Sequence, residues 1–387
     1  MSKPTSNTLL ILGIILISIN LRTSIASVGP LIPFIREDLG ISNGLAGFLT
    51  TLSLITFAVF SLFAPSIGKK IGHSQSIFFG IVLLSIGVVV RILGGVELLY
   101  LGTALTGIGI VIANVLMIPF FKARIPEQLG LMTALLSTGM SLFAAIASGI
   151  SVPLAEDLGL GWRGSLLSWV GLMVLALLVW IPQLKVRGSG QQGVMFPAKN
   201  VWKSRLAWQV TLFMGAQSVM YFTMVTWLPD MLIARGMSPV KAGWALSYMQ
   251  LISLIGTFFA PNLLMRLRQQ SGVILGVGLG YFLGYGALFV QNELITFAAL
   301  TVIGIGSGAS LSIAYTLISL RTAEDLTTAK LSGMVQSAGY VLAALGPLVF
   351  GISMDLFENW NILIWFLLAM SVQFVAFGWP AGQDRKI

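Results

Sequence analysis

Twelve apolar runs, each long enough to cross a lipid bilayer as a helix, make up most of this chain. A helix needs about 20 residues to cross the hydrocarbon core, and in lipid its backbone must satisfy its own hydrogen bonds. The runs fall at roughly 8–35, 43–68, 75–96, 97–121, 128–154, 163–184, 205–233, 240–264, 271–292, 293–320, 331–354 and 358–380. These runs predict an all-α integral membrane protein with twelve transmembrane helices.

The composition agrees with this fold class and excludes several functions. Hydrophobic residues make up 56% of the chain and charged residues 9%, against about 25% charged in soluble domains. There is no cysteine and a single histidine, so we expect no metal site. No catalytic constellation or nucleotide-binding loop is present, and we therefore expect neither an enzyme nor a cofactor. The net charge of +9 is spread over short loops, which argues against a nucleic-acid partner.

The distribution of cations over alternate loops predicts the orientation. Cytoplasmic loops of membrane proteins carry the excess of Lys and Arg. One side holds only Arg36, Arg163, Arg235 and Lys241. The other side holds Lys3, Lys69, Lys70, Lys122, Arg124, Lys185, Arg187, Lys199, Lys203, Arg205, Arg266, Arg268, Arg321, Lys330, Arg385 and Lys386. Both termini are therefore predicted to be cytoplasmic.

The two halves of the chain repeat. Pro33 aligns with Pro229, 196 residues later, and the same offset places Gly40 on Gly236, Ser42 on Ser238, Ala64-Pro65 on Ala260-Pro261 and Lys70 on Arg266. We predict an N-terminal six-helix half at 1–184, a flexible cytoplasmic linker at 185–203 and a C-terminal six-helix half at 204–387. Two parallel six-helix halves are typical of transporters with the major facilitator fold.

Arg22 is the first candidate for a functional residue, because it lies near the middle of the first run, which holds no acidic residue. A guanidinium at the bilayer centre costs about 2.5–3.5 kcal/mol on insertion scales and is usually kept where it faces a cavity or a partner. One interpretation is substrate binding, with Ser18, Ala26 and Gly29 on the same helix face. The other is a structural arginine bonded to backbone carbonyls. Its counterpart in the repeat is Ser218.

Further polar side chains inside the runs are candidates for solute contacts. Gln217 and Tyr221 lie four residues apart in the seventh run, and Gln336 and Tyr340 repeat this spacing in the eleventh. Amide and phenol groups donate and accept hydrogen bonds, and the rings offer stacking. Asn114 in the fourth run is a further candidate. The alternative for all of them is polar bonding between helices, which is common in membrane bundles.

A second arginine and the acidic residues complete the charge pattern. Arg91 lies one to two turns from the outer end of the third run, so we expect its side chain to extend to the membrane interface. Glu97, Asp230, Glu293 and Asp355 fall at the ends of runs. Proton-driven exporters normally use a carboxylate buried inside a span, and none is expected here.

Three motifs in this chain resemble the cyanate/2-nitroimidazole porter family of the major facilitator superfamily. The first is Asn20-Leu21-Arg22 with Ser27-Val28-Gly29-Pro30-Leu31; the second is Gln217-Ser218, Tyr221 and Trp227-Leu228-Pro229; the third is Leu331-Ser332-Gly333-Met334, Gln336-Ser337, Gly339-Tyr340 and Ala343-Ala344-Leu345-Gly346-Pro347. The resemblance implies a secondary transporter of small anionic or polar solutes in a bacterial inner membrane, and it favours Gln217 and Tyr221 as site residues.

These observations predict a monomeric transporter that works by alternating access, secondary active or facilitative, with Arg22 as the central charge. Its substrate class is a cyanate-like anion, a small carboxylate or a nitro-heteroaromatic. The expected partners are the lipid bilayer and the solute, with a proton or a counter-anion left open as the coupling ion. Two alternatives are a proton-coupled multidrug exporter in which Arg22 is structural and a membrane sensor that transports nothing.

Overall fold

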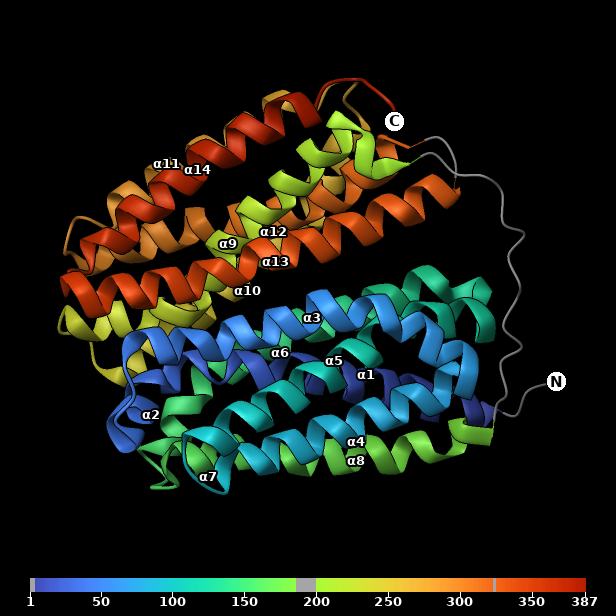
Figure 1. Cartoon of the computed structure of the whole chain (residues 1–387), viewed down its shortest axis with the longest axis horizontal. Coiled ribbons are helices and arrows are strands. Elements are labelled where there is room, and N and C mark those ends of the chain that lie inside the picture. Colours follow the sequence, from blue (N-terminus) through green and yellow to red (C-terminus); the bar gives the residue numbers. More distant parts are fainter. Residues whose placement is uncertain (1–3, 186–199, 323–324) are drawn as a thin grey trace. The chain divides into compact units, whose positions relative to one another are not determined.

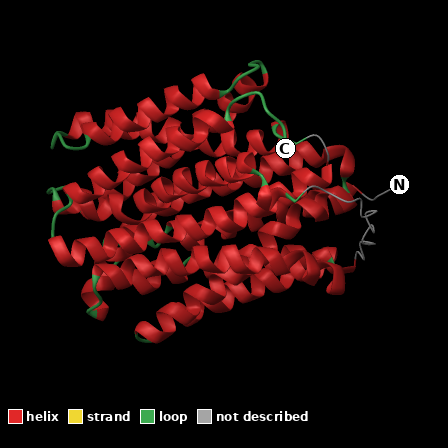
Figure 2. Cartoon of the chain, turned by 45° about the horizontal axis from the view of Figure 1, so that its top comes forward, coloured by secondary structure: helices red, strands yellow, loops and turns green. Residues whose placement is uncertain are grey.

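A computed structural model describes residues 4–185, 200–322 and 325–387 of the chain, and these residues form helices joined by short loops (Figure 1). Figure 2 shows no strand within these ranges. Ten helices in them are long and apolar enough to cross a membrane. The seventh and ninth predicted spans form α9 (Arg205–Ala234), which is rich in buried polar residues, and the shorter apolar helix α11 (Ser271–Ala287). The prediction of twelve spanning helices is confirmed.

The chain divides into two compact units. The first comprises residues 1–41 and 52–193, and the second comprises residues 42–51 and 194–387. The predicted halves at 1–184 and 204–387 stay a prediction, because most of the linker between them, residues 186–199, lies outside the described residues. One helix, α3 (Asn43–Ile71), contributes its first residues to the second unit and the remainder to the first.

The other helices of the first unit follow the predicted spans, with two interruptions. They are α1 (Pro4–Ala26), α2 (Ile32–Leu39), α4 (His73–Ile92), α5 (Val96–Arg124), α6 (Leu129–Ala155), α7 (Gly161–Leu167) and α8 (Val170–Trp180). The first span is interrupted by a 3-10 turn at Gly29–Leu31, because Pro30 lacks an amide hydrogen and disfavours helical geometry in the residue before it. The sixth span is interrupted at Ser168-Trp169, between α7 and α8.

Glycine residues let α4 and α5 approach closely within the first unit. A Cβ atom at Gly87 would lie 2.5 Å from the backbone nitrogen of Thr106, and one at Gly109 would lie 2.5 Å from the carbonyl oxygen of Gly80. Small residues at helix contacts are the usual means of close approach in membranes. The loop between these two helices contains Gly94-Gly95.

The helices of the second unit surround α9, which is buried along most of its length. They are α10 (Pro239–Met265), α11, α12 (Glu293–Leu320), α13 (Asp325–Phe357) and α14 (Asn361–Ala381). Helix α9 packs against α13 and α14, and α10 packs against α12. Gly256 of α10 and Gly308 of α12 leave no room for a Cβ atom, which would overlap the carbonyl oxygens of Ile305 and Ser253 respectively.

The first residues of α3 are held by α13 inside the second unit. The carboxylate of Asp355 accepts hydrogen bonds from the backbone nitrogens of Asn43 (2.8 Å) and Gly44 (2.7 Å) and from the side-chain amide of Asn43 (2.8 Å). A carboxylate at this position satisfies the unpaired amides of a helix N-terminus and complements the helix dipole. Asp355 therefore caps a helix that begins more than 300 residues earlier in the sequence.

Removing this cap is expected to destabilise the protein modestly. Asp355→Ala deletes three hydrogen bonds and should cost about 1 kcal/mol, the typical cost of losing a helix cap. The melting temperature of the purified protein in detergent measures this loss. Asp157→Ala is the matched control, because Asp157 is exposed at the end of α6. Equal melting temperatures for the two variants would contradict the capping role.

Candidate functional site

Arg22 lies in α1 with its side chain partly exposed, while Leu21, Thr23 and Ser24 around it are buried. The guanidinium forms no hydrogen bond or ion pair with any residue that the structure describes. Five N–H donors are therefore available to a ligand near the middle of the candidate span Thr8–Leu39. No bond from Arg22 to a backbone carbonyl is found among the described residues, so the structural alternative gains no support.

Asn114 belongs to the same unit as Arg22. It lies in α5, which contacts α1, and its side chain is partly exposed. Within the described ranges its amide has no hydrogen-bond partner. The first unit thus presents one cation and one amide whose polar atoms are not used for helix contacts.

Gln217 of α9 is only 3% exposed and is engaged by its neighbours. Its amide nitrogen donates to the hydroxyl of Ser218 at 2.6 Å, and its amide oxygen accepts from the hydroxyl of Ser310 in α12 at 3.5 Å. This geometry matches the alternative of polar bonding between helices. A role of Gln217 in solute binding stays a prediction.

The structure brings Tyr221 and Tyr340 together around one ring. Tyr221 of α9 packs edge-on against Phe222 at 5.1 Å, and Tyr340 of α13 packs edge-on against the same ring at 6.4 Å. Both tyrosines are partly exposed. Gln336 lies one turn before Tyr340 on α13, and its amide donates to Ser332 of the same helix at 3.0 Å.

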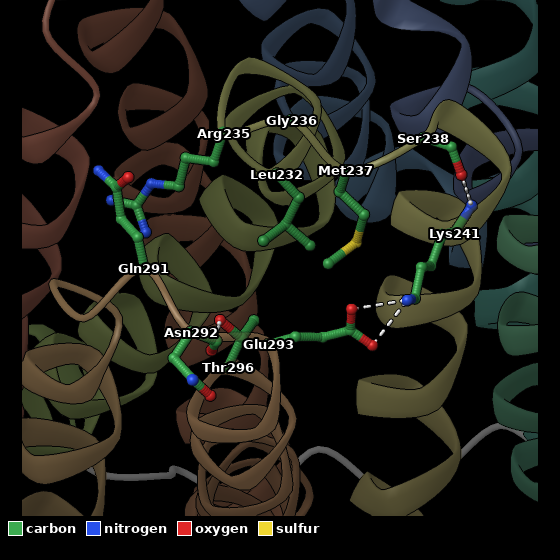
Figure 3. A pocket seen from close by; sticks show the side chains of 10 residues that line it. All are labelled: Leu232, Arg235, Gly236, Met237, Ser238, Lys241, Gln291, Asn292, Glu293 and Thr296. Atoms are coloured by element: carbon green, nitrogen blue, oxygen red, sulfur yellow. Dashed lines mark hydrogen bonds and ion pairs between the residues drawn. The ribbon is translucent and has the colours of Figure 1, made fainter.

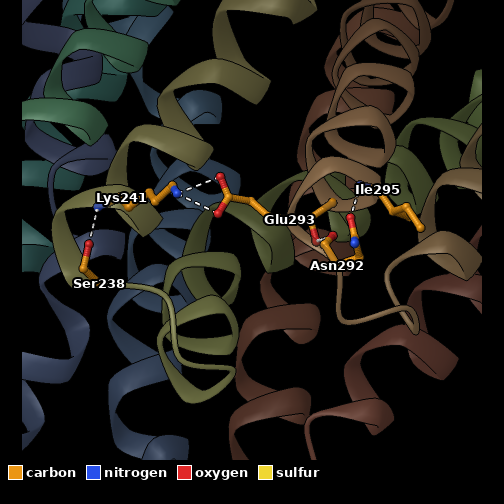
Figure 4. A network of polar contacts seen from close by, with 6 residues as sticks. Ser238, Lys241, Asn292, Glu293 and Ile295 are labelled. Atoms are coloured by element: carbon orange, nitrogen blue, oxygen red, sulfur yellow. Dashed lines mark hydrogen bonds and ion pairs between the residues drawn. The ribbon is translucent and has the colours of Figure 1, made fainter.

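A polar pocket that the sequence did not predict lies in the second unit, at the outer ends of its helices by the predicted orientation. Its volume is about 330 Å³. Figure 3 shows the side chains that line it: Leu232, Arg235, Gly236, Met237, Ser238, Lys241, Gln291, Asn292, Glu293 and Thr296. Lys241 and Glu293 pair across it at 2.6 Å (Figure 4). Partial burial lowers the pKa of Arg235, which donates to the carbonyl of Leu288. No spacing in the sequence signals this cluster, because its residues come from two separate loops.

Two predictions about charged residues differ from the structure. Arg91 is 2% exposed, and its Nη1 donates to the carbonyl oxygen of Ser24 in α1 at 3.0 Å. The prediction that Arg91 extends to the interface is wrong, because its side chain is buried and donates to a backbone carbonyl oxygen of α1. The sequence predicted no buried carboxylate within a span, but Asp230, near the end of α9, is only 5% exposed.

Two helical units with long apolar spans, one of them carrying Arg22 without a partner among the described residues, define a polytopic membrane protein. The sequence model of the Major Facilitator Superfamily matches residues 10–347. The chain belongs to this superfamily and, within it, to the cyanate/2-nitroimidazole porter family. It is a transporter of small solutes and a multi-pass protein of the bacterial inner membrane, and its family consists of transporters rather than enzymes.

Three relatives extend over nearly the whole chain. The protein named "Uncharacterized transporter YycB" of Bacillus subtilis (strain 168) is 44% identical over 98% of this chain and 94% of its own length. The "2-nitroimidazole transporter" of Escherichia coli (strain K12) is 35% identical, covering 98% of this chain and 96% of its own length. The "Cyanate transport protein CynX" of the same organism is 26% identical over 94% of each chain.

A solved structure agrees with the fold. The crystal structure of a D-xylose-proton symporter superposes with a TM-score of 0.77 over 98% of both chains, at 17% sequence identity. At this identity the likeness concerns the fold alone. The major facilitator fold predicted from the internal repeat is thereby confirmed.

Proposed function

We propose that this protein moves a small anionic or polar solute across the inner membrane by alternating access, with Arg22 as the central charge. The observation that carries the proposal is the guanidinium of Arg22, which lies in the first span, is partly exposed and is unpaired among the described residues. A retained charge that no protein group neutralises is suited to an anionic or electronegative ligand.

The proposed substrate class is a cyanate-like anion, a small carboxylate or a nitro-heteroaromatic. The names of two relatives, the 2-nitroimidazole and cyanate transporters, support this class. Asn114 is the proposed hydrogen-bonding partner from the first unit. Tyr221 and Tyr340, which both pack against Phe222 within the second unit, stay candidates for aromatic contacts with the solute.

Gln336 and Gln217 are secondary candidates, because each already bonds to a serine. We further propose that both termini face the cytoplasm, on the excess of Lys and Arg in the loops of that side. We also propose that the monomer is the transporting unit.

A ligand screen tests the proposal. Purified protein in detergent is titrated with cyanate, 2-nitroimidazole and benzoate, and the melting temperature is recorded. At least one of these solutes should raise the melting temperature saturably, because a ligand that binds only the native state stabilises it. Uptake of that solute into liposomes, with and without a proton gradient or an internal anion, then identifies the coupling.

The competing proton-coupled drug exporter makes the opposite prediction. Its one structural support is the buried carboxylate of Asp230. Lipophilic cations would then stabilise the protein and the small anions would not, and expression of the chain would confer resistance to those cations. That result would reject the proposed substrate class.

A further inference from the structure

A stripe of polar side chains lies on α1, on the side opposite Arg22. Asn20, Thr23 and Ser24 of α1, with Ser27 directly after its last residue, follow the spacing of one helix face, and each is at most 2% exposed. Arg22 is rotated by about 200° from Asn20, at about 100° per residue. The stripe is therefore buried inside the first unit and is separate from the proposed solute contact at Arg22.

Arg91 of α4 extends to this stripe with an incomplete set of partners. Its Nη1 donates to the carbonyl oxygen of Ser24 at 3.0 Å, while its buried Nε has no partner among the described residues. No carboxylate in the described part of the chain pairs with it. Arg321 in the second unit is equally buried, but both its Nε and Nη2 donate to oxygen atoms, of Ala381 and Gln270. A buried guanidinium without a counter-charge is costly, and the Nε of Arg91 still has a hydrogen bond to donate.

More unpartnered polar atoms lie on α1, which Arg91 contacts, and just before α8, which packs against both α1 and α4. Among the described residues, the hydroxyls of Thr23 and Ser27, the side-chain oxygen of Asn20 and the indole nitrogen of Trp169 are all buried without a hydrogen-bond partner. Trp169 precedes α8 and is 6% exposed. Two hydroxyls, one indole N–H and one guanidinium N–H are available as donors, against a single amide oxygen that can only accept.

The register of α1 against α8 places Trp169 at the depth of Ser24. Gly13 faces the ring of Trp180, and Asn20 donates to the carbonyl oxygen of Leu172 at 3.1 Å, so the two helices run antiparallel. Ser24 lies four residues beyond Asn20, and Trp169 lies three residues before Leu172. At 1.5 Å per residue both steps lead about 5 Å along the same direction, to the level where Arg91 meets α1.

We propose that the first unit holds a small resident anion, of the size of chloride, against Arg91. The Nε–H of Arg91, the indole N–H of Trp169 and the hydroxyls of Thr23 and Ser27 are its donors. The anion neutralises a buried cation that has no carboxylate partner, and donors outnumber acceptors as an anion site requires. Because Arg22 lies on the opposite face of α1, this anion is distinct from the transported solute, and the proposal does not rest on the proposed function.

Halide titration of the whole purified protein tests the site. The protein is exchanged into gluconate in detergent, and chloride or bromide is added at constant ionic strength while the melting temperature is recorded. We expect a saturable rise with either halide. Thr23→Val and Ser27→Ala should each raise the dissociation constant for the halide about tenfold, since each removes one hydrogen bond to a charged ligand. Bromide-soaked crystals should show anomalous density beside Arg91.

The matched control is Thr211→Val in α9, because Thr211 is equally buried but its hydroxyl donates to the carbonyl of Ala207. This variant should keep the native halide response. A melting temperature independent of halide would overturn the proposal, as would an unchanged dissociation constant in both Thr23→Val and Ser27→Ala. Density for water without bromide beside Arg91 would also reject an anion there. These tests use no substitution of Arg91, so a folding defect of such a variant does not affect them.

Discussion

Replacing Arg22 with alanine is expected to weaken solute binding by about 10- to 100-fold. A charge-assisted hydrogen bond contributes roughly 1.5–3 kcal/mol, and each 1.4 kcal/mol is a factor of ten in affinity. The guanidinium forms no bond with the described residues, so its removal should leave stability nearly unchanged. Arg22→Lys should recover part of the affinity, because it keeps the charge and loses the planar fork of donors. Affinity and melting temperature are measured on the same purified variants.

Two controls separate a binding role from a general charge effect. Arg163→Ala removes an arginine of the same unit that forms a surface ion pair with Asp38 at 2.7 Å, and such pairs contribute little. Ser218→Ala changes the counterpart of Arg22 in the repeat. Neither variant should shift affinity by more than about twofold. If Arg22→Ala lowers the melting temperature and leaves affinity intact, Arg22 is structural and the proposed mechanism is wrong.

Gly308→Ala is expected to be the most damaging single-methyl addition in the second unit. The new Cβ would overlap the carbonyl oxygen of Ser253 in α10. At the same contact, a Cβ on Gly256 of α10 would overlap the carbonyl oxygen of Ile305 in α12. Both neighbours are backbone atoms, so the helices must separate. Overpacking of this kind costs about 3 kcal/mol. Thermal unfolding in detergent and the yield of monodisperse protein on size exclusion measure the loss.

The control for this prediction is Gly276→Ala in α11, where no atom lies within 4 Å of the new Cβ. Alanine has a higher helix propensity than glycine by about 1 kcal/mol, so this variant should be neutral or slightly stabilising. Similar melting temperatures for the two variants would show that α10 and α12 can separate at little cost.

Different residues show how far the sequence could predict the site. Gln217 was predicted as a candidate from its place in the seventh run, but its contact with Ser310 depends on the position of α12, which lies about 90 residues further along the chain. The shared contact of Tyr221 and Tyr340 with Phe222 depends on how α9 and α13 pack. Spacing within one helix predicts which side chains share a face, but it does not predict which helix meets that face.

The number of spans and the repeat follow from local properties of the chain. In lipid a long apolar run has no stable alternative to a helix, because every backbone group must be satisfied internally. These features could therefore be predicted without any knowledge of helix contacts. The sequence also showed that Arg22 has no acidic residue in its own run, and the structure gives it no partner among the described residues.

Helix contacts alone decided the environment of Arg91, the capping of α3 by Asp355 and the pocket between Lys241 and Glu293. Distance from the end of a span placed Arg91 at the interface, whereas the backbone carbonyl oxygen of Ser24 in α1 accepts a hydrogen bond from its guanidinium inside the unit. The free energy of a buried charge depends on the partners within a few ångströms. Those partners come from segments far away in the sequence, so they are known only once the helices are assembled.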